Sequence, residues 1–340
     1  YFNSILYSLA LYITFTTMEN EQKLIGVLAG GYSSERGISL ASGKTAFDAF
    51  IEAGYSTIFI ELDREGFKVD GALVKISDLG LAYVFNVIHG TPGENGHISG
   101  MLEVFGIPHS TCDTFTSALT FSKFQCNTLL RDKGIVVPRG ISLMELPDLS
   151  VFSDWNFPLF VKPNRSGSSF GVSRITTIAE FTKAFEEAQK ECKEVIVEEG
   201  ISGIEVGCGV LRSAFDFGDG VQLGAKKTQA IAITEIVPTE SAFFDYQAKY
   251  DGKSQEITPA RISSETETLI QEISIRTYDV LGLNGIVRMD FIIDANNGPV
   301  LIEVNSIPGL SPASIVPQQV AYRGWKLSEV LSRLAEEQIV

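Results

Sequence analysis

The segment at residues 288–305, RMDFIIDANNGPVLIEVN, combines an arginine, two acids and an asparagine that could do chemistry together. Its DANNG stretch is typical of a turn, so the runs on either side are predicted to form an antiparallel hairpin. If the turn centres on Asn296 and Asn297, Asp290 lies directly opposite Glu303. A slip of one residue would break this arrangement, because neighbouring strand residues point to opposite faces.

Side-chain alternation along these strands places Arg288 and Asp290 on one face, where Glu303 and Asn305 meet them. Two facing carboxylates repel each other, and a divalent cation is the simplest way to relieve the repulsion. The oxygen ligands of Asp290, Glu303 and Asn305 suit Mg²⁺, which completes its shell with substrate phosphates and water. The alternative is a solvated polar face of an edge hairpin. We favour the metal site because these groups converge beside the irregular loop NSIPGLSPAS.

The loop at residues 162–171, KPNRSGSSFG, is predicted to connect two strands and is rich in small residues. Its amides and hydroxyls could approach phosphate oxygens closely, and Lys162 adds a positive charge. By itself the pattern is weak, because many hairpin loops are rich in Gly and Ser. The SGKT stretch at 42–45 does not end a P-loop, since the first glycine of that motif would fall at Ile38. We expect it to lie within a helix.

Two further loops follow predicted strands, where a parallel sheet places its ligands. In the loop at 30–37, GGYSSERG, Glu35 could stabilise the dipole of its own helix or hold a substrate ammonium, and these residues alone do not decide between the two. In the loop at 89–96, HGTPGENG, His89 is a lone histidine, which is more often structural than functional. The neighbouring Glu94 raises the odds of a function only modestly.

A fifth segment, FDYQAKY at residues 244–250, lies in a long polar connection. Long connections in compact domains often act as lids over a site. An ordered surface loop with buried aromatic residues is about equally compatible with the spacing.

The elements that must position these residues alternate between strand and helix, which predicts parallel sheet covered by helices. Three α/β blocks follow one another, with no internal repeat. The first has strands at 24–30, 57–62 and 81–88 and a helix at 38–55 that ends near Gly54. Strands are expected in the later blocks at 157–163, 172–177, 194–200, 203–212, 226–238, 285–294 and 299–305, helices at 114–134, 178–191 and 263–282, and a polar loop at 239–258.

The composition is that of a globular protein with a buried core. Against 42 Asp and Glu, the 340 residues contain 27 Lys and Arg, which gives a net charge of −15. This balance argues against general nucleic-acid binding, because phosphate neutralisation needs clustered basic residues. The four cysteines show no metal-binding spacing, so we expect reduced core residues in a reducing compartment.

The first residues are apolar but are not predicted to act as a signal peptide or a membrane anchor. Residues 1–22 contain no Lys or Arg, and the apolar run is interrupted by polar residues and too short to span a bilayer. We interpret Met18 as the natural start and residues 1–17 as a leader of uncertain origin.

Seven motifs, taken together, resemble those of the D-alanine:D-alanine ligases of the ATP-grasp superfamily. In chain order they are GGYSSERGISLASG, HGTPGENG, KPNRSGSSFGV, VEEGISGIEV, FFDYQAKY, GIVRMDF and IEVNSIPGLSPASIVP, from about Gly30 to Pro317. The resemblance implies an α/β fold, α+β in parts, with three domains. These would be a Rossmann-like N-terminal domain at 18–112, a central domain at 113–199 and a C-terminal domain at 200–340, with ATP between the last two.

The resemblance also assigns roles to residues of this chain. Glu35, Ser168, Tyr250, Arg288 and Gly309 match catalytic groups, and His89 and Ser314 match residues that bind the substrate carboxylates. Glu35 would hold the ammonium of the first D-alanine and form a hydrogen-bonded network with Ser168 and Tyr250 that closes the lid. The matches to ATP-binding residues are Lys123, Lys162, Ser169, Glu198, Ile201, Glu205 and Lys249, and those to metal ligands are Asp290, Glu303 and Asn305.

The implied reaction is ATP-dependent joining of two D-alanine molecules through a D-alanyl phosphate, for peptidoglycan synthesis. ATP and two Mg²⁺ ions, with Mn²⁺ as a substitute, would be required. The resemblance further implies a cytoplasmic homodimer without nucleic-acid or membrane partners. A Tyr rather than a His at position 250 favours an amine acceptor. The alternatives are a ligase that uses D-lactate or D-serine as acceptor, and a regulatory protein that binds ATP without catalysis.

Overall fold

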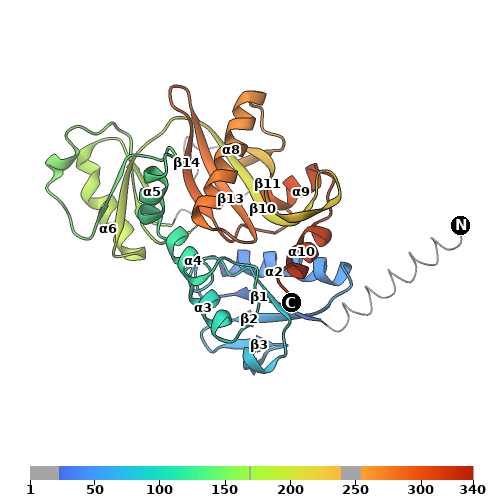
Figure 1. The fold of residues 1–340 in the computed structure, drawn as a ribbon. Helices are drawn as coiled ribbons and strands as arrows, with labels where there is room; N and C mark the ends of the chain where they lie inside the picture. Colours follow the sequence, from blue (N-terminus) through green and yellow to red (C-terminus); the bar gives the residue numbers. More distant parts are fainter. Residues whose placement is uncertain (1–22, 168–169, 239–253, 340) are drawn as a thin grey trace, which may run out of the picture.

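The computed structural model describes residues 23–167, 170–238 and 254–339, which form three β-sheets with helices packed against them. Figure 1 shows the first sheet below the third sheet, and the unit that contains α6 to one side. The leader at 1–17 and the segment FDYQAKY lie outside the described residues. Among those described, no helix is long and apolar enough to cross a membrane.

The first sheet has the strand order β4-β3-β2-β1-β5. Its strands β1, β2 and β5 are parallel, as predicted, and β3 and β4 add a short antiparallel hairpin that was not predicted. The bounds are β1 Leu24–Gly30, β2 Ser56–Leu62, β3 Phe67–Val69, β4 Ala72–Val74 and β5 Tyr83–Asn86, with α2 at Arg36–Glu52 and α3 at His97–Val104. The SGKT stretch lies within α2, as expected. Gly43 permits close packing there, because a Cβ on it would lie 2.6 Å from the Cβ of Ala29.

The single helix predicted at 114–134 is wrong, because the chain forms α4 at Thr114–Phe121 and α5 at Lys123–Asp132. Ser122 separates them with a ψ of 89°, which is not helical. Asn164 stabilises the break: its backbone carbonyl accepts from the Lys123 N–H at 3.2 Å, and its side-chain oxygen accepts from the Phe124 N–H at 2.8 Å. Lys123 is thereby placed at the start of α5, next to the loop that follows β7.

The second sheet has the strand order β6-β9-β7-β8 and holds the Gly- and Ser-rich loop between β7 and β8, as predicted. A core that includes Phe152, Phe181 and Phe185 packs against it. The bounds are β6 Gly140–Leu143, β7 Leu159–Pro163, β8 Ser173–Ile175, β9 Val195–Glu199 and α6 Phe181–Glu191, with 3-10 turns η2 at Leu149–Phe152 and η3 at Ile178–Glu180. A further 3-10 turn, η1 at Ile76–Asp78, lies between β4 and β5 of the first sheet.

The third sheet is antiparallel and has the order β12-β11-β10-β13-β14. Strand β12 lies within the polar loop expected at 239–258, so that prediction was wrong for its last residues. The bounds are β10 Gly203–Asp216, β11 Val221–Pro238, β12 Ser254–Ile257, β13 Ile286–Asp294, β14 Gly298–Asn305, α8 Ser264–Leu281, α9 Ile315–Tyr322 and α10 Leu327–Glu336.

The β13–β14 hairpin confirms that Asp290 pairs with Glu303, although the turn is not the predicted one. Asp294 pairs with Gly298, so the loop centres on Asn296 alone. A β-bulge then shifts the register by one residue, since Phe291 pairs with Leu301 and Asp290 pairs with Glu303. The extra residue, Ile302, brings Asp290 back opposite Glu303, which is the pairing predicted from a turn centred on Asn296 and Asn297.

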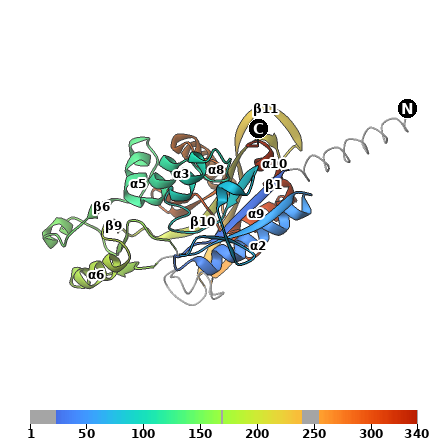
Figure 2. The same cartoon turned by 90° about the horizontal axis from the view of Figure 1, so that it is seen from below.

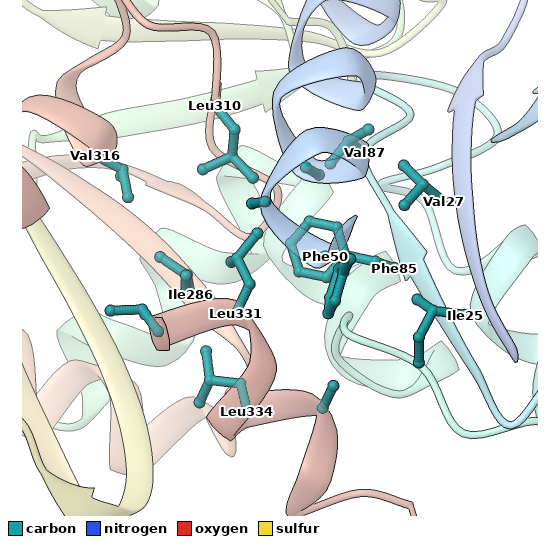
Figure 3. Packing of buried hydrophobic residues seen from close by; sticks show 14 of the residues in the cluster. Ile25, Val27, Phe50, Phe85, Val87, Ile286, Leu310, Val316, Leu331 and Leu334 are labelled. Atoms are coloured by element: carbon teal, nitrogen blue, oxygen red, sulfur yellow. The ribbon is translucent and has the colours of Figure 1, made fainter. Parts of the chain in front are cut away.

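A hydrophobic core joins the first and third sheets. Figure 3 shows Phe50 of α2 and Phe85 of β5 on one side, with Leu331 and Leu334 of α10 on the other. Helix α10 lies close to α2 in both ribbon views (Figures 1 and 2). The Tyr55 hydroxyl adds a hydrogen bond of 2.9 Å to Glu336. All four cysteines are free thiols, as predicted, but only three of them are core residues, because Cys192 is partly exposed.

Candidate active site

Two adjoining cavities contain every predicted site residue that the structure describes. The first, of about 300 Å³, lies between the loops of the first sheet and one face of the third sheet. The second, of about 590 Å³, lies between the second and third sheets. Both are lined by Lys123, Ser166, Gly167, Glu205, Ile236, Asp290 and Glu303. The β13–β14 hairpin therefore lies where the two cavities meet.

The polar residues of the hairpin are held in a defined arrangement. Arg288 donates to both oxygens of Asp290, from Nε at 2.7 Å and from Nη2 at 2.8 Å. Asn305 Nδ2 donates to Asp290 Oδ2 at 2.9 Å, and Glu303 forms an ion pair with Lys123. All four residues meet on one face of the sheet, as predicted. Arg288 fixes the Asp290 carboxylate by a two-bond contact, which is more directional than a single bond.

Within the described residues, no group of three or more His, Cys, Asp or Glu side chains is placed to hold a metal ion. The predicted set has only two acids, with Asn305 as a third oxygen donor. Its chemistry still fits Mg²⁺, because carboxylate and amide oxygens are the ligands that a hard cation takes. The first cavity also has an excess of negative charge, since the cationic side chains that line it are Lys123 and Arg288. Its acids are Glu35, Glu94, Glu205, Glu256, Asp290 and Glu303.

Lys123 reaches into both cavities from the start of α5. Burial alone would lower its pKa, but the carboxylates of Glu303, Glu94 and Glu198 outweigh this effect, so the pKa is raised. The amine is therefore a stable cation near neutral pH, suited to an anionic ligand.

In the second cavity, Lys162 of β7 forms an ion pair of 2.6 Å with Glu198 of β9. Asn127 donates to the other oxygen of Glu198 at 3.0 Å, and Glu198 is only 3% exposed. Ile201 and Glu205 line the same cavity. The predicted phosphate lysine and the predicted adenine residue are thus brought into direct contact. Ser168, Ser169, Lys249 and Tyr250 lie outside the described residues.

At the other end of the first cavity, Glu35 is 7% exposed and lies against two loops. A Cβ on Gly167, from the loop after β7, would lie 2.3 Å from Glu35 Oε2. A Cβ on Gly90 would lie 3.1 Å from the same oxygen. Glycines at both positions therefore allow the loops to close around this carboxylate.

His89 connects this end of the cavity to the loop before α9. Its Nε2 lies 3.4 Å from Ser42 Oγ, which accepts from the Leu310 N–H at 3.0 Å. Burial, helped by the positive charge of nearby Arg288, lowers the pKa of His89 to about 4. The imidazole is therefore neutral near pH 7 and acts as a hydrogen-bonding group rather than a charge.

Glu94 also lines the first cavity, although its place in the sequence indicates a function only weakly. It accepts from the Gly90 N–H at 2.8 Å. Burial, together with the nearby charges of Glu35 and Glu303, raises the pKa of Glu94 to about 8. The signal that could have found it is its position in HGTPGENG, five residues after His89.

The loop before α9 contributes Gly309 and Ser314. Ser314 immediately precedes α9, and its Oγ lies 2.8 Å from Ser311 Oγ. A Cβ on Gly309 would lie 2.8 Å from Ser314 Oγ, so a glycine keeps this backbone accessible at the cavity wall. Glu256 of β12 also lines the first cavity and was not predicted, because β12 itself was not predicted.

Comparisons with known proteins agree with this architecture. Residues 144–336 match the family described as D-ala D-ala ligase C-terminus. A D-alanine–D-alanine ligase from Porphyromonas gingivalis is 36% identical, with 93% of this chain and 98% of the relative covered. One from Flavobacterium johnsoniae is 37% identical, with 92% and 98% covered.

Solved structures show the same similarity. D-alanyl-alanine synthetase A from Vibrio cholerae has a TM-score of 0.82 and 26% identity, covering 94% of this chain and 99% of that one. The VanG D-Ala:D-Ser ligase from Enterococcus faecalis has a TM-score of 0.77 and 31% identity, with the same coverage.

The three sheets, with one cavity between the second and third, define an enzyme of the ATP-grasp class. The matches over nearly the whole length are more specific. This chain belongs to the D-alanine–D-alanine ligase family.

Proposed function

We propose that this protein joins two molecules of D-alanine into D-alanyl-D-alanine, with ATP converted to ADP and phosphate, and that the product serves peptidoglycan synthesis. The observation that carries the proposal is the meeting of the two cavities at Lys123, Asp290 and Glu303. A reaction that transfers a phosphoryl group from ATP to a second substrate needs the two binding sites to share a boundary.

In this proposal, ATP occupies the second cavity. Lys123, Lys162 and Ser169 bind its phosphates, Glu198 and Ile201 the adenine, Glu205 the ribose, and Lys249 the nucleotide from the lid side. The pairing of Lys162 with Glu198 supports a nucleotide role for this wall, because an anionic phosphate can replace one carboxylate partner of the lysine.

The two D-alanine molecules occupy the first cavity. Glu35 binds the ammonium of the first one, and neutral His89 lies beside its carboxylate. Ser314 binds the carboxylate of the second molecule at the start of α9, where unpaired helix amides favour an anion. The position of Glu35 in the wall of the first cavity supports its role, because a carboxylate there can contact an ammonium bound in the cavity.

The chemistry proceeds in two steps. The carboxylate of the first D-alanine attacks the terminal phosphorus of ATP, giving D-alanyl phosphate and ADP. The ammonium of the second loses a proton, and the resulting amine attacks the carbonyl carbon. The bond from that carbon to the phosphate oxygen then breaks, and phosphate leaves. Arg288 and the Gly309 N–H stabilise the charge that develops in these steps, and loss of one such donor typically raises the barrier by about 3–4 kcal/mol.

Asp290, Glu303 and Asn305 would hold two Mg²⁺ ions, or Mn²⁺ in their place. Bound there, the metal would supply positive charge to neutralise the phosphoryl oxygens. Arg288 keeps the Asp290 carboxylate in a fixed orientation for this purpose.

Glu35, Ser168 and Tyr250 form the proposed network that closes the lid, and this part of the proposal rests on the resemblance. The close approach of Gly167 to Glu35 supports it, because it brings the loop that carries Ser168 to this carboxylate. Closure would exclude water, which otherwise hydrolyses an acyl phosphate.

We further propose a cytoplasmic homodimer, with D-alanine and ATP as ligands and no nucleic-acid or membrane partner. The division into domains at 18–112, 113–199 and 200–340 is also a proposal. It is supported by the three sheets, of which one falls in each range.

The proposal is tested by incubating the protein with ATP, Mg²⁺ and D-alanine and measuring the mass of the product. D-serine and D-lactate are offered in parallel, because one similar solved structure is a D-Ala:D-Ser ligase. A dipeptide of two D-alanines as the main product would support the proposal. If a product forms only with D-serine or D-lactate, the proposal is wrong and the protein is a ligase that uses that acceptor.

A further inference from the structure

The face of the third sheet that lines the first cavity carries one acid for which the reaction above has no role. Glu256 of β12 pairs with Ile236 of β11, which in turn pairs with Glu205 of β10. All three line the first cavity, so the Glu256 side chain is on the same face as the polar residues of the hairpin. Glu256 lies within the described part of the chain that resumes at residue 254.

A contact with α9 fixes where along the cavity Glu256 lies. Gln318 Nε2 donates to Glu256 Oε2 at 2.6 Å and to the Ala313 carbonyl at 2.8 Å. Because one nitrogen makes both bonds, the carboxylate lies within two hydrogen-bond lengths of Ala313, the residue before Ser314. Glu256 is therefore at the end of the cavity proposed for the second substrate, next to the group that would bind its carboxylate.

The surroundings leave this carboxylate suited to a cation. Within the described residues, this carboxylate accepts a hydrogen bond from Gln318, a neutral amide. Arg288, whose charge acts on Glu256, already makes two bonds to Asp290. Burial raises the pKa of Glu256, opposed by the Gln318 bond and the charge of Arg288, and an ammonium beside it would offset that burial.

We propose that Glu256 determines acceptor specificity by binding the ammonium of the second substrate while Ser314 binds its carboxylate. The inference rests on the proposed function and adds the residue that selects the acceptor class. An α-amino acid presents both charges to this pair of groups, whereas a 2-hydroxy acid presents only its carboxylate and places a neutral hydroxyl beside Glu256. The acid therefore favours an amine acceptor and disfavours a hydroxy acid.

The test is the variant Glu256→Gln, which keeps the shape and an oxygen that can accept from Gln318. The protein is given ATP, Mg²⁺ and D-alanine with increasing D-lactate at one pH, and both products are measured by mass. We expect the apparent KM for D-alanine as acceptor to rise about tenfold, with the KM for D-alanine as donor little changed. The ratio of D-alanyl-D-lactate to D-alanyl-D-alanine should rise by a similar factor.

The matched control is Glu186→Gln, which removes the same charge from the exposed face of α6 and should leave both the ratio and the KM values unchanged. Glu256→Asp retains the charge and should keep the wild-type product ratio even where it is less stable. If Glu256→Gln is folded and active but its product ratio is unchanged, the role of Glu256 is overturned while the proposed function stands. If the wild-type protein forms neither product from D-alanine, the proposed function fails and this inference fails with it.

Discussion

Gly167 lies so close to Glu35 that a Cβ at this position would be 2.3 Å from the carboxylate oxygen Oε2. The two residues come from different sheets: Glu35 precedes α2 of the first sheet, and Gly167 follows β7 of the second. Their contact couples the substrate end of the first cavity to the Gly- and Ser-rich loop that also lines the second. The position of each loop thus depends on the other.

Gly167→Ala is expected to lower kcat/KM for D-alanine by about 10- to 100-fold, because the methyl group must displace Glu35 or the loop. Gly167 does not have a positive φ, so an alanine there is not strained by its own backbone. Steady-state ADP release measures the effect. Gly224→Ala is the control, since a Cβ there meets nothing within 4 Å. Equal activity of the two variants would contradict the proposed role of this contact.

Glu303→Gln should lower Mg²⁺-dependent turnover by about 100-fold or more while the fold is retained. The substitution removes a carboxylate from the hairpin and the ionic partner of Lys123. ADP release over a range of Mg²⁺ concentrations tests this, with urea unfolding to confirm the fold. Glu272→Gln, on the exposed side of α8, should behave as wild type. Near-normal turnover in Glu303→Gln would remove the metal assignment.

Glu94→Gln should change the pH dependence of stability. The pKa of Glu94 is raised from 4.5 to about 8, so between these values the folded state binds a proton that the unfolded state has lost. The free energy of unfolding therefore falls as pH rises, by up to about 1.4 kcal/mol per pH unit from this group. Removing the acid should make the variant increasingly more stable than wild type from pH 5 to pH 8.

Urea denaturation at each pH gives the difference between Glu94→Gln and the wild type. Glu52→Gln, at the exposed end of α2, is the control for the loss of one surface acid. A difference for Glu94→Gln that stays flat from pH 5 to pH 8 would show that this carboxyl is not protonated in the folded protein.

Gln319→Leu should destabilise the protein by about 2–4 kcal/mol, because it removes three buried hydrogen bonds. Gln319 Nε2 donates to the Gly207 carbonyl at 2.9 Å and to Thr234 Oγ1 at 3.0 Å, and its oxygen accepts from the Gly209 N–H at 2.9 Å. Chemical denaturation measures the change. Gln222→Leu, at an exposed strand position, should cost far less, and a similar loss in both variants would refute this reasoning.

The local pattern of the sequence predicts most of the fold, because strand and helix periodicity are local properties. The parallel part of the first sheet, the helix around SGKT and the β13–β14 hairpin are all confirmed. The break at Ser122 could not be predicted, because it depends on bonds from Asn164, more than 40 residues away in the chain. The bulge at Ile302 likewise depends on pairing rather than on the residue itself.

The candidate site is predictable only in part for the same reason. The pairing of Asp290 with Glu303 follows from a hairpin and its turn, which are close in sequence. The contact between Gly167 and Glu35 and the position of Glu256 beside α9 require the sheets to be assembled. No spacing rule reports such contacts. Roles for these residues therefore rest on the structure, on the family and on the experiments above.

The most direct test of the central claim measures ADP release and product mass in one reaction with ATP, Mg²⁺ and D-alanine, beside the same reaction with L-alanine. The proposed function predicts D-alanyl-D-alanine formed together with ADP, and no dipeptide from the L isomer. The claim would be contradicted if the folded protein bound ATP but released no ADP, or formed no product from D-alanine. The protein would then be a nucleotide-binding protein without ligase activity.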